Sequence, residues 1–237
     1  MTPAELTGRA DSHVVSLDEP GIRVHRAALA PFAAMREAAA AAGIDLAVAS
    51  AFRDFARQRV IWNAKWRGER PVLDAAGAPV DVAALDPPAR VAAILRWSAL
   101  PGGSRHHWGT DLDVWDRAAV APDYRLRLVP EEYAPGGPFA ALGGWLDRNM
   151  RRYGFYRPYA TAGGGVRPEP WHLSFAPVAE PARRALDVPI LAAAIRGAGV
   201  LGEDAILAAL PGIEARYLAS VDRPPRMRSR WALAGRG

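Results

Sequence analysis

The chain of 237 residues contains no cysteine, and its 30 basic residues are arginines with the single exception of Lys65. Without cysteine, disulfide bonds, thiolate catalysis and cysteine-ligated zinc are excluded, so any metal must be held by histidine and carboxylate side chains. The sequence also lacks an apolar run long enough to span a bilayer. Because no basic segment followed by an apolar one marks a leader at the N-terminus, we expect a cytoplasmic protein, or a periplasmic one if a leader was removed.

The charge balance is weakly basic, since 30 basic and 25 acidic residues give a formal charge of +5. Long basic runs with interleaved aromatic residues, which are typical of nucleic-acid binding, are missing except for a weak trace at the C-terminal end. We therefore expect no nucleic-acid partner. Half of the residues are hydrophobic, which is enough for a sizeable core in one large domain or in one domain with an appendage.

Side chains with useful chemistry gather in two short stretches. The first reads Ser-Arg-His-His-Trp-Gly-Thr-Asp-Leu-Asp at 104–113, and the second reads Glu-Pro-Trp-His at 169–172. A hydrolytic metal site needs such side chains: neutral imidazoles and a carboxylate hold the ion, and one spare carboxylate moves protons.

Both stretches are predicted to lead into strands that have one apolar and one polar face. After residue 110 the sequence alternates, so Asp111 and Asp113 share the polar face. Two prolines exclude a helix interior in the second stretch, and a strand there puts His172 on its polar face. His106 can converge with Asp113 only if Gly109 allows a bend or bulge. We therefore expect two neighbouring strands that share a site.

The remaining pattern predicts an α+β fold, in which helices flank a small antiparallel sheet that carries the site. The expected elements are helices at 30–43, 54–67, 87–100 and 139–153, strands at 45–52 and 155–157, a strand-like run at 124–129, and C-terminal helices at 181–186, 190–196 and 203–219.

The pattern Ser-x-His-x-x-Gly-x-x-x-Asp followed by Glu-Pro-Trp-His resembles the zinc D-alanyl-D-alanine carboxypeptidases of the VanY type. Their relatives include D-alanyl-D-alanine dipeptidases and phage cell-wall endopeptidases. Further matches are Ser-Ala-Phe-Arg at 50–53 with Gln58, and Trp-Leu-Asp-Arg-Asn at 145–149 running into Tyr-Gly-Phe at 153–155. The resemblance implies a zinc peptidase domain at 1–176 with its motif-bearing core at 45–176. It leaves out residues 177–237, where we expect a helical appendage and a basic tail.

Carried over position by position, the resemblance implies that His106, Asp113 and His172 hold a zinc ion, with water in the fourth place. Glu169 is then the general base and later the general acid. Arg53 stabilises the oxyanion or holds the substrate. This donor set suits zinc but also accepts other divalent ions.

The resemblance also suggests substrate-pocket residues, with two positions that depart from the family. The predicted substrate-binding residues are Ser104, Gln58, Asp111 and His107. Many family members carry alanine in place of Asp111, which either orients a ligand imidazole or reads a substrate amino group. We expect His107 to be a hydrogen-bonding pocket residue, because a further protein ligand would close the catalytic position. Two other histidines, His13 and His25, are more typical of structural positions than of ligands.

The leading hypothesis is a zinc-dependent carboxypeptidase that removes the terminal D-alanine from peptidoglycan peptides by Glu-assisted attack of a zinc-bound water. Ser174 stands where many carboxypeptidases carry arginine, so both D,D- and L,D-cleavage are open. In the cytoplasm the substrate would be a recycled muropeptide or a precursor. The alternatives are a peptidoglycan endopeptidase or dipeptidase, and a non-catalytic, metal-containing module that binds cell-wall peptides.

Overall fold

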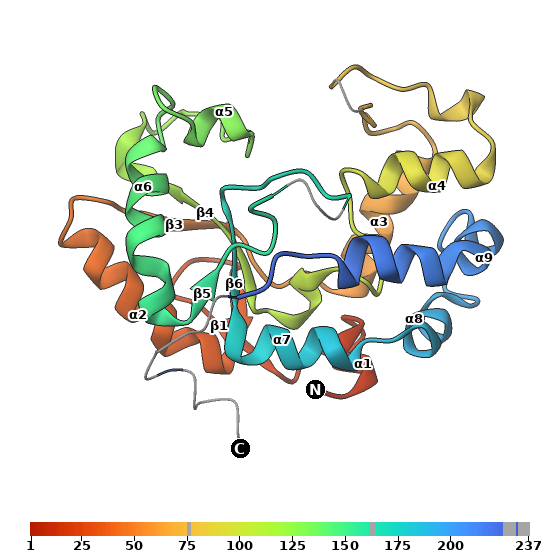
Figure 1. Cartoon of the computed structure of the whole chain (residues 1–237), viewed down its shortest axis with the longest axis horizontal. Helices are drawn as coiled ribbons and strands as arrows, with labels where there is room; N and C mark the ends of the chain where they lie inside the picture. The colour runs from red at the N-terminus through yellow and green to blue at the C-terminus, as the bar shows by residue number, and fades with distance from the viewer. Residues whose placement is uncertain (75–76, 162–164, 225–230, 232–237) are drawn as a thin grey trace.

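A four-stranded antiparallel sheet lies at the centre of the computed structural model (Figure 1). The structure describes residues 1–74, 77–161, 165–224 and 231. The strands of the sheet, in spatial order, are β3 (Leu46–Ser50), β4 (Asp111–Asp116), β6 (His172–Phe175) and β5 (Phe155–Tyr156). A separate hairpin pairs β1 (Val14–Ser16) with β2 (Arg23–His25). The predicted α+β fold with a small antiparallel sheet is confirmed.

Helices flank the sheet on both sides. They are α1 (Pro3–Leu6), α2 (Arg26–Ala40), α3 (Phe55–Trp66), α4 (Pro87–Leu95), α5 (Pro130–Tyr133), α6 (Ala140–Asn149), α7 (Ala176–Ala185), α8 (Val188–Ile195) and α9 (Glu203–Ile213). Tighter or wider turns occur at η1 (Val82–Ala84), η2 (Arg105–Trp108), η3 (Arg117–Ala119), η4 (Met150–Tyr153) and the π-helical η5 (Glu214–Ala219). In Figure 1, α2 and α6 lie on one side of the sheet, whereas α3, α4, α8 and α9 gather on the other. Among the described residues, no helix combines the length and apolar character needed to cross a bilayer.

Aspartate side chains fix the starts of several helices. Asp54 accepts a hydrogen bond from Arg57 N at 2.7 Å and begins α3, as the sequence predicted. Asp86 does the same for α4 and Asp187 for α8. Each cap satisfies a backbone N–H that has no partner within its helix. The helix predicted at 87–100 ends earlier than expected, at Leu95.

The strand-like run at 124–129 is not a strand, so this prediction is wrong. The segment instead wraps around the buried carboxylate of Glu132. Tyr124 Oη donates to Glu132 Oε1 at 2.8 Å, and Arg127 N donates to the same oxygen at 3.1 Å. Since these donors are used by one side chain, the alternating sequence does not form a ladder with another strand.

Two hydrophobic clusters make up the core. One packs the sheet against α2 and α6, with Phe32, Leu112, Leu146 and Leu173 among its buried members. The other joins α1, α3 and α4 to the C-terminal helices α7, α8 and α9, so helices beyond residue 176 share a core with the N-terminal half. The predicted division at residue 176 stays a prediction. Most of the predicted basic tail lies outside the described residues.

His25 caps α2 and makes stability depend on pH. Its Nδ1 accepts a hydrogen bond from Ala27 N at 3.1 Å, which a doubly protonated ring cannot do. Burial, with help from the nearby charges of His13 and Arg26, lowers the pKa of His25 from 6.5 to about 4. Between these values the unfolded chain binds more protons than the folded one. This stability is therefore present above pH 6.5 and is lost as the pH falls toward 4.

We expect His25→Asn to flatten the dependence of unfolding free energy on pH. Asparagine keeps an N-cap acceptor but does not titrate. The difference between pH 7 and pH 4 should shrink by up to about 3 kcal/mol relative to the parent protein. Urea unfolding at both pH values measures this difference in unfolding free energy. Parallel pH profiles for the two proteins would contradict the assignment of the pH dependence to His25.

Candidate metal centre and active-site cavity

The pairing of β4 with β6 brings two polar side chains to the same place. In this antiparallel pair Asp113 lies opposite His172, and Asp111 lies opposite Ser174. The alternate residues, including Leu173, are buried in the core cluster. Because side chains of a strand alternate between its faces, the polar residues of both strands project from the same side of the sheet.

His106 reaches this site from the turn that precedes β4. It lies in η2, and Gly109 ends the turn in the left-handed region with φ of 65°. A Cβ atom at Gly109 would come within 2.6 Å of Val14 Cγ1, so both the conformation and the close packing require glycine. The bend expected at Gly109 is confirmed. It places the His106 ring with its centroid 5.0 Å from that of His172.

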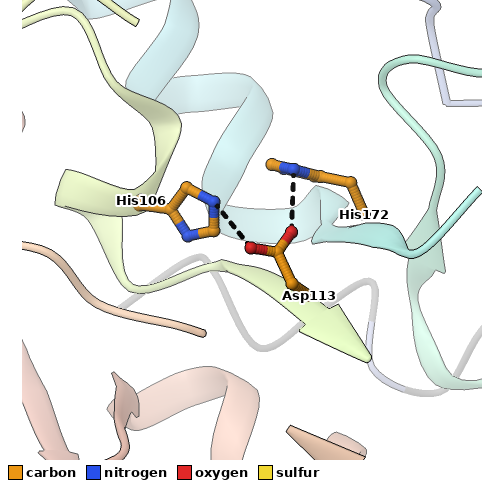
Figure 2. A group of neighbouring side chains, drawn as sticks. All are labelled: His106, Asp113 and His172. Atoms are coloured by element: carbon orange, nitrogen blue, oxygen red, sulfur yellow. Dashed lines mark ion pairs between the residues drawn. The ribbon is translucent and has the colours of Figure 1, made fainter. Parts of the chain in front are cut away.

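One ligand atom from each of His106, Asp113 and His172 lies within 4.8 Å of the other two. Figure 2 shows both imidazoles directed at the carboxylate between them. His106 Nε2 is 3.5 Å from Asp113 Oδ2, and His172 Nδ1 is 3.3 Å from Asp113 Oδ1. All three residues are buried. Two imidazoles and one carboxylate form a known donor set of catalytic zinc sites.

Hydrogen bonds on the outer sides of the rings leave lone pairs facing inward. His106 Nδ1 lies 2.8 Å from Ala51 O, so this nitrogen carries the proton and Nε2 is free to bind. His172 Nε2 lies 2.9 Å from Asp111 Oδ1, which leaves Nδ1 for the centre. Among the described residues, Asp113 Oδ1 is buried without a hydrogen-bond partner. A divalent cation would satisfy these three atoms, so the residues present fit a zinc ion.

Charges around the centre favour a positive occupant. Burial lowers the pKa of His106 to about 4, so its imidazole is neutral and able to bind a metal at neutral pH. Burial also acts to lower the pKa of His172, but the neighbouring carboxylates of Asp111, Asp113 and Glu169 outweigh it and raise this pKa well above 6.5. The carboxylates thus attract either a proton or a metal ion to His172 Nδ1.

Asp111 forms a buried network behind His172. Its carboxylate accepts hydrogen bonds from Arg105 Nε at 2.8 Å, Thr110 Oγ1 at 2.6 Å and Ser174 Oγ at 3.1 Å. Despite the burial of Asp111, the charge of Arg105 keeps its pKa below the usual value. The side chain is fully buried and does not line the cavity. Of the two roles considered for Asp111, this geometry favours orientation of His172 over contact with substrate.

We expect Asp111→Asn to weaken zinc binding by ~10–100-fold, because the carboxylate that fixes the His172 ring is lost. The melting temperature should fall as well, since Arg105 then keeps a buried charge without its ionic partner. A competition titration with a chromogenic chelator, carried out well below the melting temperature, measures the affinity. Ser174→Ala, which removes one hydrogen bond from the same carboxylate, should give a smaller change. Unaltered zinc affinity in Asp111→Asn would contradict the orienting role.

The candidate metal centre opens onto a cavity of about 180 Å³. Among the predicted site residues that line it are Arg53, Ser104, His106, Asp113, Glu169 and His172. Glu169 Oε2 lies 3.0 Å from His172 Nδ1, and its side chain is 27% exposed whereas that of His172 is 4% exposed. Glu169 therefore reaches from the edge of the centre into the solvent-accessible part of the cavity.

Arg53 is held in place by residues on both of its sides. Its guanidinium donates to Gln58 Oε1 at 2.9 Å and to Ser50 Oγ at 3.2 Å. Its backbone oxygen accepts from His107 Nδ1 at 2.6 Å, while His107 Nε2 accepts from Gly102 N at 3.0 Å. Gln58 and His107 are fully buried and do not line the cavity. Their geometry therefore fits positioning of Arg53 better than the substrate contact predicted for them.

Several cavity residues carried no motif in the sequence. Tyr159 packs its ring 5.0 Å from the His172 ring, and burial raises its pKa to about 12. Trp97, Tyr217 and Leu218 also line the cavity. His13 and His25 are not part of the metal-binding group found among the described residues. His13 instead bonds to the backbone oxygen of His107 at 2.9 Å.

Comparison with known proteins places this geometry in a family. The model of the VanY D-alanyl-D-alanine carboxypeptidases matches residues 21–178. The chain belongs to the VanY family. An uncharacterized protein of Haemophilus influenzae is 35% identical over 121 residues, which are 50% of this chain and 92% of that protein. The predicted VanY-type family is confirmed, and with it a peptidase fold.

Solved VanY structures share this fold. A mutant of the vancomycin-resistance D,D-pentapeptidase VanY from a VanB-type cassette, in complex with Zn(II), is 26% identical with a TM-score of 0.50. That match covers 73% of this chain and 83% of the other. VanYB in complex with D-alanine-D-alanine is 24% identical with a TM-score of 0.51, covering 74% and 83%. These similarities support the fold, and the His106, Asp113 and His172 group makes a zinc site possible in this VanY protein.

Proposed function

We propose that this VanY-family protein is a zinc carboxypeptidase that releases the terminal D-alanine from peptidoglycan peptides. One observation carries the proposal: a possible metal centre, a partly exposed glutamate and a fixed arginine line the same cavity. The inventory matches what metal-assisted peptide hydrolysis needs, namely a cation, a proton carrier and a stabiliser of negative charge.

The chain's own side chains divide the steps of hydrolysis. A zinc ion held by His106, Asp113 and His172 would polarise the scissile carbonyl and make water a stronger nucleophile. Glu169 accepts a proton from the attacking water as the C–O bond forms. It then passes this proton to the leaving nitrogen as the C–N bond breaks. Arg53 still has guanidinium N–H groups beyond those used by Gln58 and Ser50, and it directs positive charge at the developing oxyanion.

The identity of the substrate rests on similarity and on one feature of the cavity. VanYB binds D-alanine-D-alanine, which makes a peptide ending in alanine the first substrate to test. Ser174 replaces an arginine common in carboxypeptidases, yet Arg105 Nη2 lies 2.6 Å from Ser174 Oγ and Arg105 lines the cavity. A guanidinium is therefore present beside position 174, which supports the recognition of a peptide carboxylate.

The test is digestion of defined muropeptides by the zinc-loaded protein, followed by mass spectrometry. Loss of alanine from a pentapeptide indicates D,D-cleavage, and loss of alanine from a tetrapeptide indicates L,D-cleavage. Release of a dipeptide or opening of a cross-linked dimer would favour the dipeptidase or endopeptidase alternative. If every peptide stays intact, the protein is not a carboxypeptidase, and the non-catalytic binding module is the better interpretation. The cytoplasmic location and a role in muropeptide recycling stay predictions.

A further inference from the structure

The C-terminal segment, which follows the part of the chain matched by the family at 21–178, contributes to the active-site cavity. Tyr217 and Leu218 of η5 line the same cavity as His106 and Glu169. In Figure 1 the chain after α9 runs back toward the central sheet. The helix widens from α to π at residue 214, and such turns are frequent at functional sites.

Packing fixes this segment against both sides of the cavity. Leu218 Cδ2 lies 3.5 Å from the point where a Cβ atom of Gly103 would be, so its side chain packs directly beside the Ser104 turn. The side chains of Arg216 and Tyr217 lie similarly close to Gly165. Preceding helix α9 is anchored by buried residues, among them Leu210, in the core cluster that contains α4. Tyr217 and Leu218 thus project from an anchored element.

Asp222 joins the same segment to the loop after β5. Its carboxylate accepts hydrogen bonds from Thr161 N at 2.8 Å and from Thr161 Oγ1 at 2.9 Å. Its backbone N donates to Pro158 O at 2.9 Å. This loop carries Tyr159, which lines the cavity next to His172. The C-terminal segment therefore supplies one wall of the cavity through Tyr217 and Leu218. It also fixes the loop that carries Tyr159, which forms a second wall.

We propose that Tyr217 and Leu218 close one side of the cavity and so restrict the protein to the free end of an uncross-linked peptide. The inference rests on the proposed carboxypeptidase function. The cavity of about 180 Å³ is smaller than the roughly 300–1,000 Å³ of typical ligand pockets. Leu95, Trp97 and Leu100 add apolar surface to it, which suits the methyl side chain of alanine.

Closure of the cavity decides between two kinds of substrate. In a cross-linked peptide the alanine carbonyl is joined to the amino group of a second stem peptide, so the chain continues past the bond to be cut. A cleft open on both sides accepts such a chain, whereas a cavity closed by Tyr217 and Leu218 accepts only a chain end. These two residues are therefore specificity determinants, separate from the metal ligands and from Glu169.

The experiment compares the parent protein with the double variant Tyr217→Ala/Leu218→Ala on two substrates: a free stem peptide and a cross-linked muropeptide dimer. We expect kcat/KM for the free peptide to fall about tenfold, mainly through KM, because apolar contacts in the bound state are lost. Hydrolysis of the cross-link in the dimer should rise. The ratio of the two kcat/KM values should then shift at least ~tenfold toward the dimer. The exposed neighbour Ala215 provides the matched control, Ala215→Ser.

The outcomes separate this inference from the proposed function. If the parent protein cleaves the free peptide and the double variant keeps the parent ratio of kcat/KM values, the proposed closure by Tyr217 and Leu218 is wrong and the carboxypeptidase function is supported. If the zinc-loaded parent cleaves no peptide, the proposed function is wrong, and so is the inference that Tyr217 and Leu218 restrict its substrate. Circular dichroism and zinc content verify that the variants fold. Should the double variant not fold, the single variant Tyr217→Leu must still shift the ratio toward the dimer, or the inference is overturned.

Discussion

We expect the replacement of Glu169 with glutamine to lower the turnover number of the zinc-loaded protein by at least ~100-fold, while zinc remains bound. Glutamine has nearly the same shape as glutamate but cannot accept and return a proton. Glu169 lies outside the group of three residues that could hold a metal ion, although its carboxylate is 3.0 Å from His172 Nδ1. The change therefore removes the proton carrier and leaves the metal ligands in place.

Two measurements test this expectation together. Release of alanine under saturating peptide gives kcat, and elemental analysis of the dialysed protein gives zinc content. Glu131→Gln is the matched control, because Glu131 is exposed and does not line the cavity. A Glu169→Gln protein with the parent turnover would return Glu169 to a structural role. Loss of zinc together with activity would instead make it a ligand.

Removal of zinc by a chelator should abolish measurable peptidase activity and leave the protein folded. The candidate ligands are positioned without a metal ion, since β4 pairs with β6 and the outer nitrogens of His106 and His172 bond to Ala51 O and Asp111. Adding zinc should restore activity. At zinc concentrations of 1,000 times Kd it should also raise the free energy of unfolding by about 4 kcal/mol.

Thermal unfolding with and without zinc, run beside the peptide assay, measures both effects. Asp113→Ala should lose the zinc-induced stabilisation, because the carboxylate between the two imidazoles is gone. His25→Asn should keep it, since His25 lies outside the metal-binding group among the described residues. Full activity in protein shown to be metal-free would refute the metal-dependent mechanism.

Strand alternation made much of the site predictable from sequence. The pattern around Asp111 and Asp113 indicates a strand with one polar face, and the prolines before His172 exclude a helix. Gly109 was the one position able to bend the chain between His106 and Asp113, and it has the required left-handed conformation. Local sequence patterns were sufficient here because each of the two stretches contains its own candidate ligands. The antiparallel pairing of β4 with β6 then brings the two stretches together.

Contacts between distant segments could not be predicted in this way. Asp111 and His107 were predicted among the substrate-binding residues, with orientation of a ligand imidazole as the other role considered for Asp111. Their surroundings include Arg105, Gly102 and Gly8, and local spacing does not reveal these contacts. The run at 124–129 alternates like a strand yet serves as a set of donors to Glu132. The helices after residue 176 were expected, but the position of Tyr217 in the cavity depends on tertiary packing alone.

The first residues of the chain hydrogen-bond to the elements that carry the site, and this limits how far the chain can be shortened. Leu6 O accepts from Trp108 Nε1 at 3.1 Å, and Gly8 O accepts from Phe55 N at 2.8 Å. A fragment trimmed to the family match at 21–178 would lose these supports together with Tyr217. A minimal fragment should therefore keep both ends of the chain, because the residues that support the site and line its cavity extend beyond the range that the family model matches.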